Sequence, residues 1–380
     1  MSDFIMPTYQ RWSVEFVSGS GCRVVDSAGR SYLDLVAGIA VAIIGHAHPA
    51  VTAAVADQAA TLVHVSNLYA TRPQTVLAER LAALTGGKLS FFCNSGAEAI
   101  ECALKLARKW GGEAKHRVIA AQGSFHGRTF GALAATGQPA KQAPFEPMLP
   151  GFDHVPYGDV DALQSALSDE VAAVLLEPIQ GESGVVVPPD DYLGAVRSLC
   201  DESGALLILD EIQTGLGRTG RWFAHNHYEV DPDVMCLAKG IAGGLPMGVC
   251  LASPDVAAAF SVGDHASTFG GGPVQCAASL AVLDVIKSDR LVERAAEAGA
   301  RIMKELERIA ASAHVRGRGL MIGVEFDRPV ARDIAAAALE HGVLVNDATA
   351  SVVRLTPPLV ISDDEIDESL AILEEVLGAI

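Results

Sequence analysis

The chain has 380 residues, of which 50% are hydrophobic and 19% are charged, so it can bury the cores of two domains and is not disordered. The formal net charge of -18 argues against nucleic acid and anionic membrane surfaces as partners. No apolar run approaches the roughly 20 residues of a membrane span, and the N-terminus shows no basic region before an apolar stretch, so we expect neither a membrane anchor nor a signal peptide. Seven scattered cysteines without a CxxC pair indicate a reduced, cytoplasmic protein.

The predicted elements begin with a hairpin over residues 21–35, whose two strands flank an Asp-Ser-Ala-Gly turn. From residue 49 onward, short β-rich runs alternate with amphipathic helices. Helices are expected over 98–110 and 189–203, and strands over 89–93, 117–121, 171–176, 205–209 and 249–252. This alternation is typical of an α/β fold with a mostly parallel, mixed sheet between helices.

The rest of the chain predicts a second, smaller α+β unit. Its expected elements are helices over 274–286 and 291–313, a strand over 319–326, a helix over 334–341, a strand over 352–355 and a final amphipathic helix. We expect residues 49–272 to form a large cofactor-binding domain. Residues 1–48, with the hairpin, and residues 273–380 are expected to form the small domain.

An acid and a lysine carry the strongest chemical signal. Asp210 follows the most hydrophobic strand of the chain, residues 205–209, and Lys239 lies between an apolar stretch and a glycine-rich loop. An acid at a buried strand end can hold a proton on a heteroaromatic nitrogen, and a lysine in an apolar turn can form an imine with an aldehyde. Together they indicate an enzyme that uses pyridoxal 5'-phosphate (PLP).

Two further segments suit the same chemistry. Ser95, Gly96 and Ala97 open a helix directly after a strand, where backbone N–H groups and the helix dipole favour a phosphate, although Ser95 with Glu98 also fits a plain helix cap. Phe125 adjoins small residues and can stack on a flat ring. The nearby Arg128 is the residue type that binds a carboxylate with two hydrogen bonds, but a surface turn could also carry it.

A buried arginine and a strand-end glutamate complete the polar set. Arg354 lies inside an apolar strand and must find an anion, because burying it unpaired is costly. Glu182 follows the strand over 171–176, at the kind of sheet edge where open α/β sheets bind ligands, but a solvated loop is the alternative.

Two other patterns are rejected. Gly215–Gly220 matches G-x-G-x-x-G, but residues 210–214 separate it from the strand and no convincing helix follows, so we do not expect NAD binding. The pairs His46/His48 and His225/His227 have a spacing of two residues, which points the imidazoles apart on a strand or a helix, so no metal site is expected.

In order along the chain, these segments resemble the class III (subgroup II) PLP-dependent aminotransferases, and among them the acetylornithine aminotransferases. The resemblance runs from about residue 24 almost to the C-terminus. It is carried by Gly45-His46-Ala47-His48-Pro49, Phe92-Cys93-Asn94-Ser95-Gly96-Ala97-Glu98-Ala99, Ser124-Phe125-His126-Gly127-Arg128-Thr129, Leu176-Glu177-Pro178-Ile179-Gln180-Gly181-Glu182, Leu209-Asp210-Glu211-Ile212-Gln213-Thr214-Gly215, Leu237-Ala238-Lys239-Gly240, Ser267-Thr268-Phe269-Gly270-Gly271 and Arg354-Leu355-Thr356-Pro357-Pro358-Leu359. It implies fold type I of the PLP enzymes.

The resemblance implies a role for each cofactor-binding residue. Lys239 would form the imine with PLP and then move the substrate proton, with its pKa lowered by burial, while Asp210 would keep the pyridine nitrogen protonated. Gln213 would hydrogen-bond the ring hydroxyl and Phe125 would stack on the ring. The phosphate would lie on Ser95, Gly96 and Ala97, and Thr268 would reach the phosphate in the other subunit of a homodimer.

The resemblance also implies how one site accepts two substrates. The distant carboxylate of N-acetylornithine would bind Arg128, whereas 2-oxoglutarate, with a carboxylate at each end, would also need Arg354. Glu182 would pair with Arg354 while the amino donor is bound and swing away for the diacid. The implied reaction moves the δ-amino group of N-acetylornithine to 2-oxoglutarate, giving glutamate, in the cytoplasm and as part of arginine biosynthesis.

The chain departs from the family pattern at Ala42, Ile100, Ser183 and Gly272, none of which is a catalytic group. Ornithine aminotransferases carry a tyrosine about where Gly38 or Ile39 stands, so the small apolar segment here favours an acylated donor. Ornithine, succinylornithine, 4-aminobutyrate and acetyl-lysine-type donors are the alternatives. A PLP aminomutase, racemase or decarboxylase is less favoured because it needs no such gate, and a protein that only binds the cofactor would have no need of Lys239.

Overall fold

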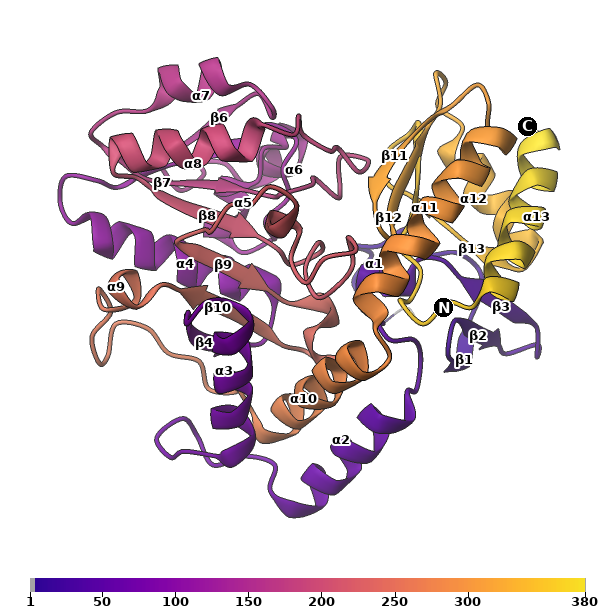
Figure 1. Cartoon of the computed structure of the whole chain (residues 1–380), viewed down its shortest axis with the longest axis horizontal. Helices are drawn as coiled ribbons and strands as arrows, with labels where there is room; N and C mark the ends of the chain where they lie inside the picture. The colour runs from indigo at the N-terminus through magenta and orange to yellow at the C-terminus, as the bar shows by residue number, and fades with distance from the viewer. Residues whose placement is uncertain (1–3, 380) are drawn as a thin grey trace.

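The computed structural model describes residues 4–379 and shows two lobes, each built around its own β-structure (Figure 1). The larger lobe contains a seven-stranded sheet in the order β4-β10-β9-β8-β7-β5-β6. Only β10 runs antiparallel to its neighbours, so the sheet is mixed and mostly parallel, as predicted. Its strands are β4 (Leu89–Cys93), β5 (Arg117–Ala121), β6 (Phe152–Val155), β7 (Val171–Leu176), β8 (Leu206–Asp210), β9 (Val234–Leu237) and β10 (Gly248–Ala252).

Helices cover both faces of this sheet. On β7, Ala173 and Leu175 pack with the residues of α4 (Gly96–Gly111), whereas Val174 and Leu176 pack with those of α8 (Tyr192–Ser203). Because alternate side chains of a strand point to opposite faces, a strand buried on both sides has to be apolar throughout. This explains why the central strands are continuous hydrophobic runs. The smaller helices of this lobe are α5 (Phe130–Ala135), α6 (Pro139–Gln142), α7 (Val160–Ala166) and α9 (Pro254–Ala257), with 3₁₀ turns η1 (Ala143–Phe145), η2 (Ala224–His227) and η3 (Lys239–Ala242).

The smaller lobe joins the two ends of the chain. The predicted N-terminal hairpin is confirmed, and its strand β3 pairs in parallel with β13 from the C-terminal part. One sheet has the order β1-β2-β3-β13, and the other has the antiparallel order β11-β12-β15-β14. The strands are β1 (Phe16–Ser20), β2 (Arg23–Asp26), β3 (Ser31–Asp34), β11 (His314–Arg318), β12 (Met321–Glu325), β13 (Val343–Leu344), β14 (Asn346–Asp347) and β15 (Val352–Leu355), and the helices are α11 (Leu291–Ile309), α12 (Ala331–Glu340) and α13 (Asp363–Ala379).

At the bottom of the molecule in the view of Figure 1, α2 (Pro49–Thr61) and α3 (Arg72–Leu84) pack against the long helix α10 (Pro273–Ser288). The segment labelled α1 (Ala37–Ala40) is a left-handed turn, with φ between 51° and 64° at all four residues. Left-handed backbone costs roughly 1–2 kcal/mol for each residue other than glycine. The surrounding structure therefore has to hold this turn in place, and the turn leads directly to Val41, which lines the cavity of the candidate active site.

Some expectations were wrong in detail. Helix α11 ends at Ile309 and not at residue 313, because the chain enters strand β11 at His314. Strands β6 and β9 were not predicted, since each is only four residues long and shows little periodicity. The domain boundaries at residues 49 and 272 stay a prediction. Among the described residues, no helix is both long enough and apolar enough to cross a membrane.

Candidate active site

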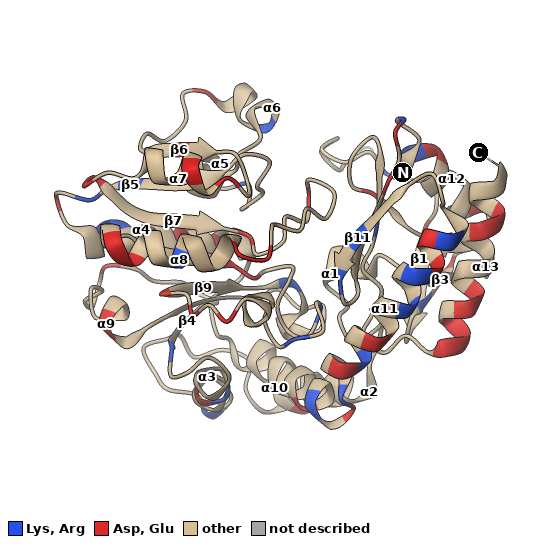
Figure 2. Ribbon diagram, turned by 45° about the horizontal axis from the view of Figure 1, so that its top comes forward, with Lys and Arg blue, Asp and Glu red and all other residues tan. Residues whose placement is uncertain are grey.

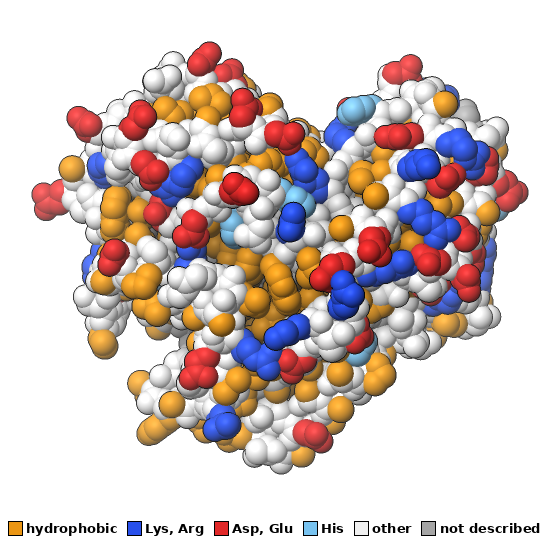
Figure 3. All heavy atoms as spheres, viewed as in Figure 1, with side chains coloured by type: hydrophobic (Ala, Val, Ile, Leu, Met, Phe, Trp, Pro, Cys, Tyr) orange, Lys and Arg blue, Asp and Glu red, His pale blue; other side chains and the backbone are white. Residues whose placement is uncertain are grey.

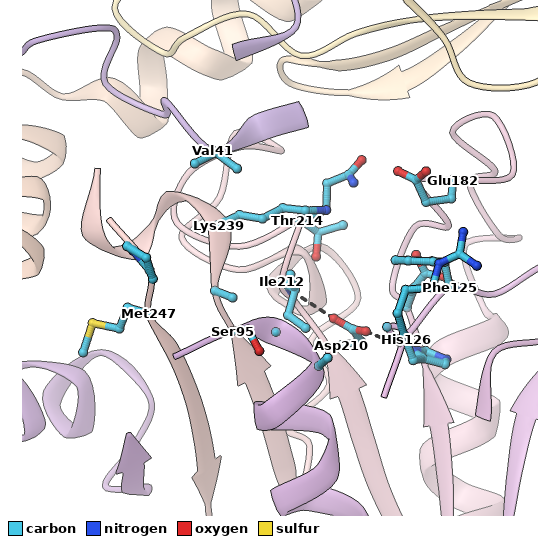
Figure 4. A pocket seen from close by; sticks show the side chains of 18 of the residues that line it. Val41, Ser95, Phe125, His126, Glu182, Asp210, Ile212, Thr214, Lys239 and Met247 are labelled. Atoms are coloured by element: carbon cyan, nitrogen blue, oxygen red, sulfur yellow. Dashed lines mark hydrogen bonds and ion pairs between the residues drawn. The ribbon is translucent and has the colours of Figure 1, made fainter. Parts of the chain in front are cut away.

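The predicted site residues meet at one edge of the large sheet. Strands β4, β5, β7, β8 and β9 share one direction, so their C-terminal ends lie along the same edge. A cavity of about 440 Å³ opens there, a size within the range of small-molecule sites. Figure 4 shows the side chains around it. The predicted residues that line it are Ser95, Gly96, Ala97, Phe125, Arg128, Glu182, Asp210, Gln213 and Lys239.

Asp210 is buried at the end of β8 and is held by two hydrogen bonds. Its Oδ2 lies 2.8 Å from Nδ1 of His126, and its Oδ1 accepts a bond of 3.1 Å from the backbone N–H of Ile212 (Figure 4). The Nε2 atom of His126 is buried without a hydrogen-bond partner among the described residues. The pair therefore places an oriented carboxylate on the cavity wall, suited to hold a proton on a ring nitrogen.

Lys239 follows β9 and lines the same cavity. Its backbone is in the left-handed region, with φ of 46°, a conformation that costs energy in a residue other than glycine and is often found at functional sites. Burial lowers the pKa of the Lys239 amine to about 8, with Glu182, Asp210 and Glu177 acting in the opposite direction. A useful fraction of the amine is therefore unprotonated near neutral pH, and only this form attacks an aldehyde.

The start of α4 fits a phosphate. The Ser95 side chain caps the helix by accepting a bond of 3.2 Å from the N–H of Glu98, which leaves the N–H groups of Gly96 and Ala97 without intrahelical partners. A Cβ atom on Gly96 would lie 2.8 Å from Cδ1 of Ile212, so a larger residue there would require the Ile212 side chain to move. The cap that the sequence suggested is therefore present, and the free N–H groups beside it suit an anion.

The buried Arg354 forms an ion pair with the partly buried Glu182. Nη1 of Arg354 donates to Oε1 of Glu182 at 2.8 Å, to the carbonyl oxygen of Gly181 at 2.9 Å and to Oε1 of Gln213 at 3.1 Å. Burial opposes ionisation of Glu182, but Arg354 and then Lys239 outweigh it, so the pKa of its carboxyl is lowered. The arginine inside an apolar strand thus has the anion that its burial requires.

Arg128 is exposed at the mouth of the cavity. Its guanidinium carbon lies 5.6 Å from the centre of the Phe125 ring, and both residues line the cavity. An exposed arginine here can receive a carboxylate from solvent without first breaking a buried ion pair. Arg128 and Arg354 therefore differ in one respect, since only the second is already paired with an acid.

Thr268 lies outside this cavity. It is exposed and lines two other depressions, one with Asn67 and Gln74 and the other with His265. Its predicted role needs a second subunit and stays a prediction.

Two site residues were missed by sequence reasoning. His126 lies in one of the family motifs, but its local sequence indicates no role for it, because its partner Asp210 lies 84 residues further along the chain. Glu177 lines the cavity, and burial raises the pKa of its carboxyl to about 7, with Asp210 adding to this effect while His126 opposes it. The only sequence signal for Glu177 was an acid directly after a buried strand.

The departures from the family pattern have simple structural roles. Ile100 is buried in the core between α4 and the sheet. Gly272 is the N-cap of α10 and offers it no side-chain cap. Ser183 donates from its Oγ to the carbonyl oxygen of Gly123. Ala42 donates its backbone N–H to Ala37, at 2.8 Å, and so helps to close the left-handed turn.

The rejected patterns have other contacts. The glycine-rich loop over residues 215–220 carries the fully buried Arg218, which donates at 3.0 Å to the carbonyl oxygen of Leu320 in the smaller lobe. His46 lies 2.7 Å from Asp34, and His225 lies 3.0 Å from Glu211. Within residues 4–379, no three His, Cys, Asp or Glu side chains gather as a metal site would require.

The fold and the site together define a class of enzyme. A lysine with a lowered pKa, an oriented carboxylate and a helix N-terminus surround one cavity at the C-terminal edge of a mixed α/β sheet, and these groups fit the aldehyde, the ring nitrogen and the phosphate of PLP. This arrangement is that of the PLP-dependent aminotransferases.

Comparison with known proteins specifies the family. Residues 5–377 match the model of the class III aminotransferases, and the chain belongs to this PLP-dependent family. It is 50% identical to an acetylornithine aminotransferase of Gloeobacter violaceus, over 98% of this chain and 96% of that protein. It is 52% identical to an acetylornithine aminotransferase of Mycobacterium bovis, over 98% of this chain and 94% of that protein.

Solved structures show the same likeness. The ornithine aminotransferase of Toxoplasma gondii superposes with a TM-score of 0.95 at 36% identity, over 99% of this chain and 93% of that one. The acetylornithine aminotransferase of Elizabethkingia anophelis gives a TM-score of 0.89 at 32% identity, over 99% and 96%. The predicted fold class is therefore confirmed.

Proposed function

We propose that the chain transfers the δ-amino group of N-acetyl-L-ornithine to 2-oxoglutarate, giving N-acetylglutamate 5-semialdehyde and glutamate, as a step of arginine biosynthesis. The observation that carries the proposal is the arrangement of two arginines, one exposed and one paired with Glu182, around the cavity that Lys239 lines. The identity of about 50% to proteins named acetylornithine aminotransferase supports the same donor.

The proposed roles follow from the contacts. When bound, PLP supplies an aldehyde that takes up amino groups and a ring that accepts electron density. Lys239 would hold the aldehyde and later move the proton of the reacting substrate carbon through its Nζ atom. Asp210, oriented by His126, would hold the proton of the ring nitrogen, while Phe125 would stack on the ring and Gln213 would donate to the ring hydroxyl. Ser95, Gly96 and Ala97 would hold the phosphate.

The two arginines would sort the two substrates. N-acetylornithine has no carboxylate next to its reacting amine, so its single carboxylate would bind the exposed Arg128 while Glu182 keeps Arg354 neutralised. 2-Oxoglutarate carries a carboxylate at each end, and the second one would replace Glu182 on Arg354. Exchange of one anion for another leaves the buried guanidinium paired in both half-reactions, which avoids the cost of an isolated buried charge.

A half-reaction measurement tests this proposal. Holoenzyme would be mixed with N-acetyl-L-ornithine in the absence of any keto acid, and separately with L-ornithine, N-succinyl-L-ornithine and 4-aminobutyrate, while the cofactor absorbance is followed. Fast conversion to the amino form of the cofactor with N-acetylornithine supports the proposal. Faster conversion with one of the other amines would reject the proposed donor, and no conversion with any amine would reject transamination of these compounds.

Ornithine is the second candidate donor, since the fold superposes closely on an ornithine aminotransferase. The segment before Val41, which lines the cavity, opposes it. Gly38 and Ile39 form the left-handed turn before Val41, and neither offers a hydroxyl group to the free α-amino acid end of ornithine. An acylated nitrogen, which carries no charge, suits this apolar turn better.

We further propose a homodimer in which Thr268 reaches the phosphate site of the partner subunit. Exposed apolar side chains surround Thr268, and Figure 3 shows hydrophobic side chains at the surface around α3. Asn67 connects its own segment to the one that carries Thr268, because its side chain donates to the carbonyl oxygens of Ser267, at 3.1 Å, and Gly270, at 2.9 Å. The exposed apolar residues nearby are Leu62, Val63, Leu68, Tyr69 and Phe269, and such a cluster is typical of a protein interface.

Mixed dimers test the shared site. A dimer of one Lys239→Ala chain and one Thr268→Ala chain would contain one complete site, because Lys239 of one chain would meet Thr268 of the other. Activity of the mixture above that of either variant alone supports the proposal, whereas activity no greater than the average of the two would reject it.

The proposed location is the cytoplasm. All seven cysteines are free and buried, which suits a reducing compartment. Fractionation of cells that express the protein would test this, and recovery in a membrane or extracellular fraction would reject it.

A further inference from the structure

Two loops at the sheet edge are linked to one another beneath the cavity. Residues 122–128 follow β5 and carry Phe125 and Arg128, and residues 177–186 follow β7 and carry Glu182. Gln180 donates through Nε2 to the carbonyl oxygen of Gln122 at 2.9 Å, and Ser183 donates to that of Gly123. The loops therefore form one connected unit, although the bonded residues lie 58 and 60 positions apart in sequence.

Glu177 is the central link of this unit. Its Oε2 accepts a bond of 3.1 Å from the backbone N–H of Phe125, and its Oε1 accepts a bond of 3.2 Å from that of Gly181. The side chain is only 7% exposed and forms no ion pair with Lys or Arg among the described residues. Burying a carboxylate is costly, so its position between two N–H groups requires a reason. None of the proposed catalytic steps uses the carboxyl group of Glu177.

The contacts continue from Glu177 to both arginines. On one side, Phe125 carries the ring over which Arg128 lies, with 5.6 Å between the guanidinium carbon and the ring centre. On the other side, Gly181 accepts a hydrogen bond of 2.9 Å from Arg354 through its carbonyl oxygen. One carboxylate thus holds the backbone group next to each of the two candidate carboxylate-binding side chains.

We infer that Glu177 is a positioning residue that sets the separation between Arg128 and Arg354, and that it thereby determines which length of dicarboxylate the site accepts. The inference rests on the proposed function, in which these arginines bind the carboxylates of the keto acid. A dicarboxylate has to reach both arginines at once and is therefore sensitive to their separation. A donor with a single carboxylate uses Arg128 alone and is much less sensitive.

The test compares binding of unreactive dicarboxylates to the holoenzyme. Succinate, glutarate and adipate have the same end groups, differ only in length, and carry neither an amino nor a keto group. Each would be titrated while the cofactor absorbance is followed. The wild type is expected to bind glutarate, which has the length of 2-oxoglutarate, most tightly.

In Glu177→Gln, an NH₂ group would face one of the two backbone N–H donors in a side chain of the same size. We expect glutarate binding to weaken by roughly tenfold, because one N–H group is left unpaired. We also expect the preference among the three lengths to narrow, and the KM of N-acetylornithine to change much less. Glu177→Asp should give the same result, since the shorter side chain cannot reach both N–H groups. It serves as the second variant if Glu177→Gln does not fold.

Tyr157→Phe is the matched control. The Tyr157 hydroxyl donates to the carbonyl oxygens of Glu177, at 2.8 Å, and Pro178, at 3.0 Å, so the change removes two hydrogen bonds from the same segment but leaves the carboxylate bonds intact. This variant should keep the length preference of the wild type. The inference would be overturned if Glu177→Gln kept the wild-type preference among the three dicarboxylate lengths. It would also be overturned if Tyr157→Phe lost that preference to the same extent as Glu177→Gln.

The two proposals fail in different ways. If N-acetylornithine does not convert the wild-type cofactor, the proposed donor is wrong, while the dicarboxylate titrations still test Glu177. If the donor is converted and the Glu177 variants keep the wild-type preference, only the role of Glu177 is wrong.

Discussion

Two regions of this protein use the same chemistry, arginine with carboxylate, in opposite environments. At the sheet edge, the Arg354 side chain is 1% exposed and its partner Glu182 is 27% exposed. Between α11 and α13, Arg301 forms an ion pair of 3.0 Å with Asp363, and the two side chains are 38% and 65% exposed. Arg308 likewise pairs with Glu374 at 2.9 Å, and both of these side chains are more than half exposed. Figure 2 shows these charges along the facing helices of the smaller lobe.

The difference shows where charge has a function in this chain. Exposed pairs are screened by water and salt, and each contributes little. A buried guanidinium that loses its partner becomes an isolated charge in a poorly solvated site, which is far more costly. We therefore expect changes at the sheet edge to have large effects on activity, and changes between α11 and α13 to have almost none.

The largest effect is expected for Lys239→Ala. Without this amine, no group in the cavity can hold the cofactor aldehyde or move the substrate proton, so steady-state turnover should fall below detection. Lys105→Ala, which removes a surface lysine, serves as the control and should keep full activity. Substantial turnover by Lys239→Ala would contradict the assignment of this residue.

Asp210→Asn comes next. The amide cannot hold a proton on a ring nitrogen, and we expect kcat to fall by roughly 10²- to 10⁴-fold, the usual range for a positioned proton-transfer group. The measurement is kcat at saturating cofactor, with the melting temperature as a check on folding. If kcat fell no more than in a variant of a nearby surface acid such as Asp191→Asn, the role of Asp210 would be wrong.

The pH dependence of cofactor loading should follow the lowered pKa of Lys239. The pKa is about 8, so the reactive neutral amine is dominant above pH 8 and decreases about tenfold per pH unit below it. The rate at which the cofactor-free protein takes up PLP should therefore rise about fiftyfold from pH 6 to pH 8 and level off after roughly a further twofold rise above pH 8. A rise that continues to pH 10 would indicate an unperturbed lysine.

Glu182→Ala should change substrate preference more than folding. It leaves Arg354 without its acid, so amino donors with a carboxylate next to the amine, such as glutamate, should gain relative to N-acetylornithine. We expect the ratio of kcat/KM for the two donors to shift by tenfold or more, on the order of the cost of one unpaired buried partner. An unchanged ratio would show that Glu182 does not act as a gate.

The smallest effect is expected for Arg301→Ala in the smaller lobe. The side chain contacts Asp363 and Asp367 at the surface, where solvent screens both pairs. The thermal unfolding curve and the steady-state kinetics should both match those of the wild type. A clear loss of activity would mean that the helices α11 and α13 influence the site, and that the exposed ion pairs between them also contribute to activity.

Much of the fold could be predicted from the sequence. The central strands of the large sheet are apolar on both faces and so form uninterrupted hydrophobic runs, which are easily recognised. Short elements such as β9, with four residues, and the boundary between α11 and β11 could not be predicted, since too few residues are present to show a period.

Most predicted site residues line one cavity. They could be recognised from the sequence because their chemistry was visible in local patterns. His126 and Glu177 were missed because their importance lies in their partners. Nothing near His126 in sequence indicates that it orients Asp210, and nothing near Glu177 indicates that it accepts hydrogen bonds from Phe125 and Gly181 together.

By itself, the sequence determined the types of chemical group in the site, the alternation of strands and helices, and the family to which the chain belongs. The tertiary structure alone decided the distances among these groups, and with them the buried pairs Asp210–His126 and Arg354–Glu182. The physical reason is that local propensity and periodicity act over a few residues. The pKa values and pairings of buried charges depend instead on groups that parallel strands bring together from distant parts of the chain.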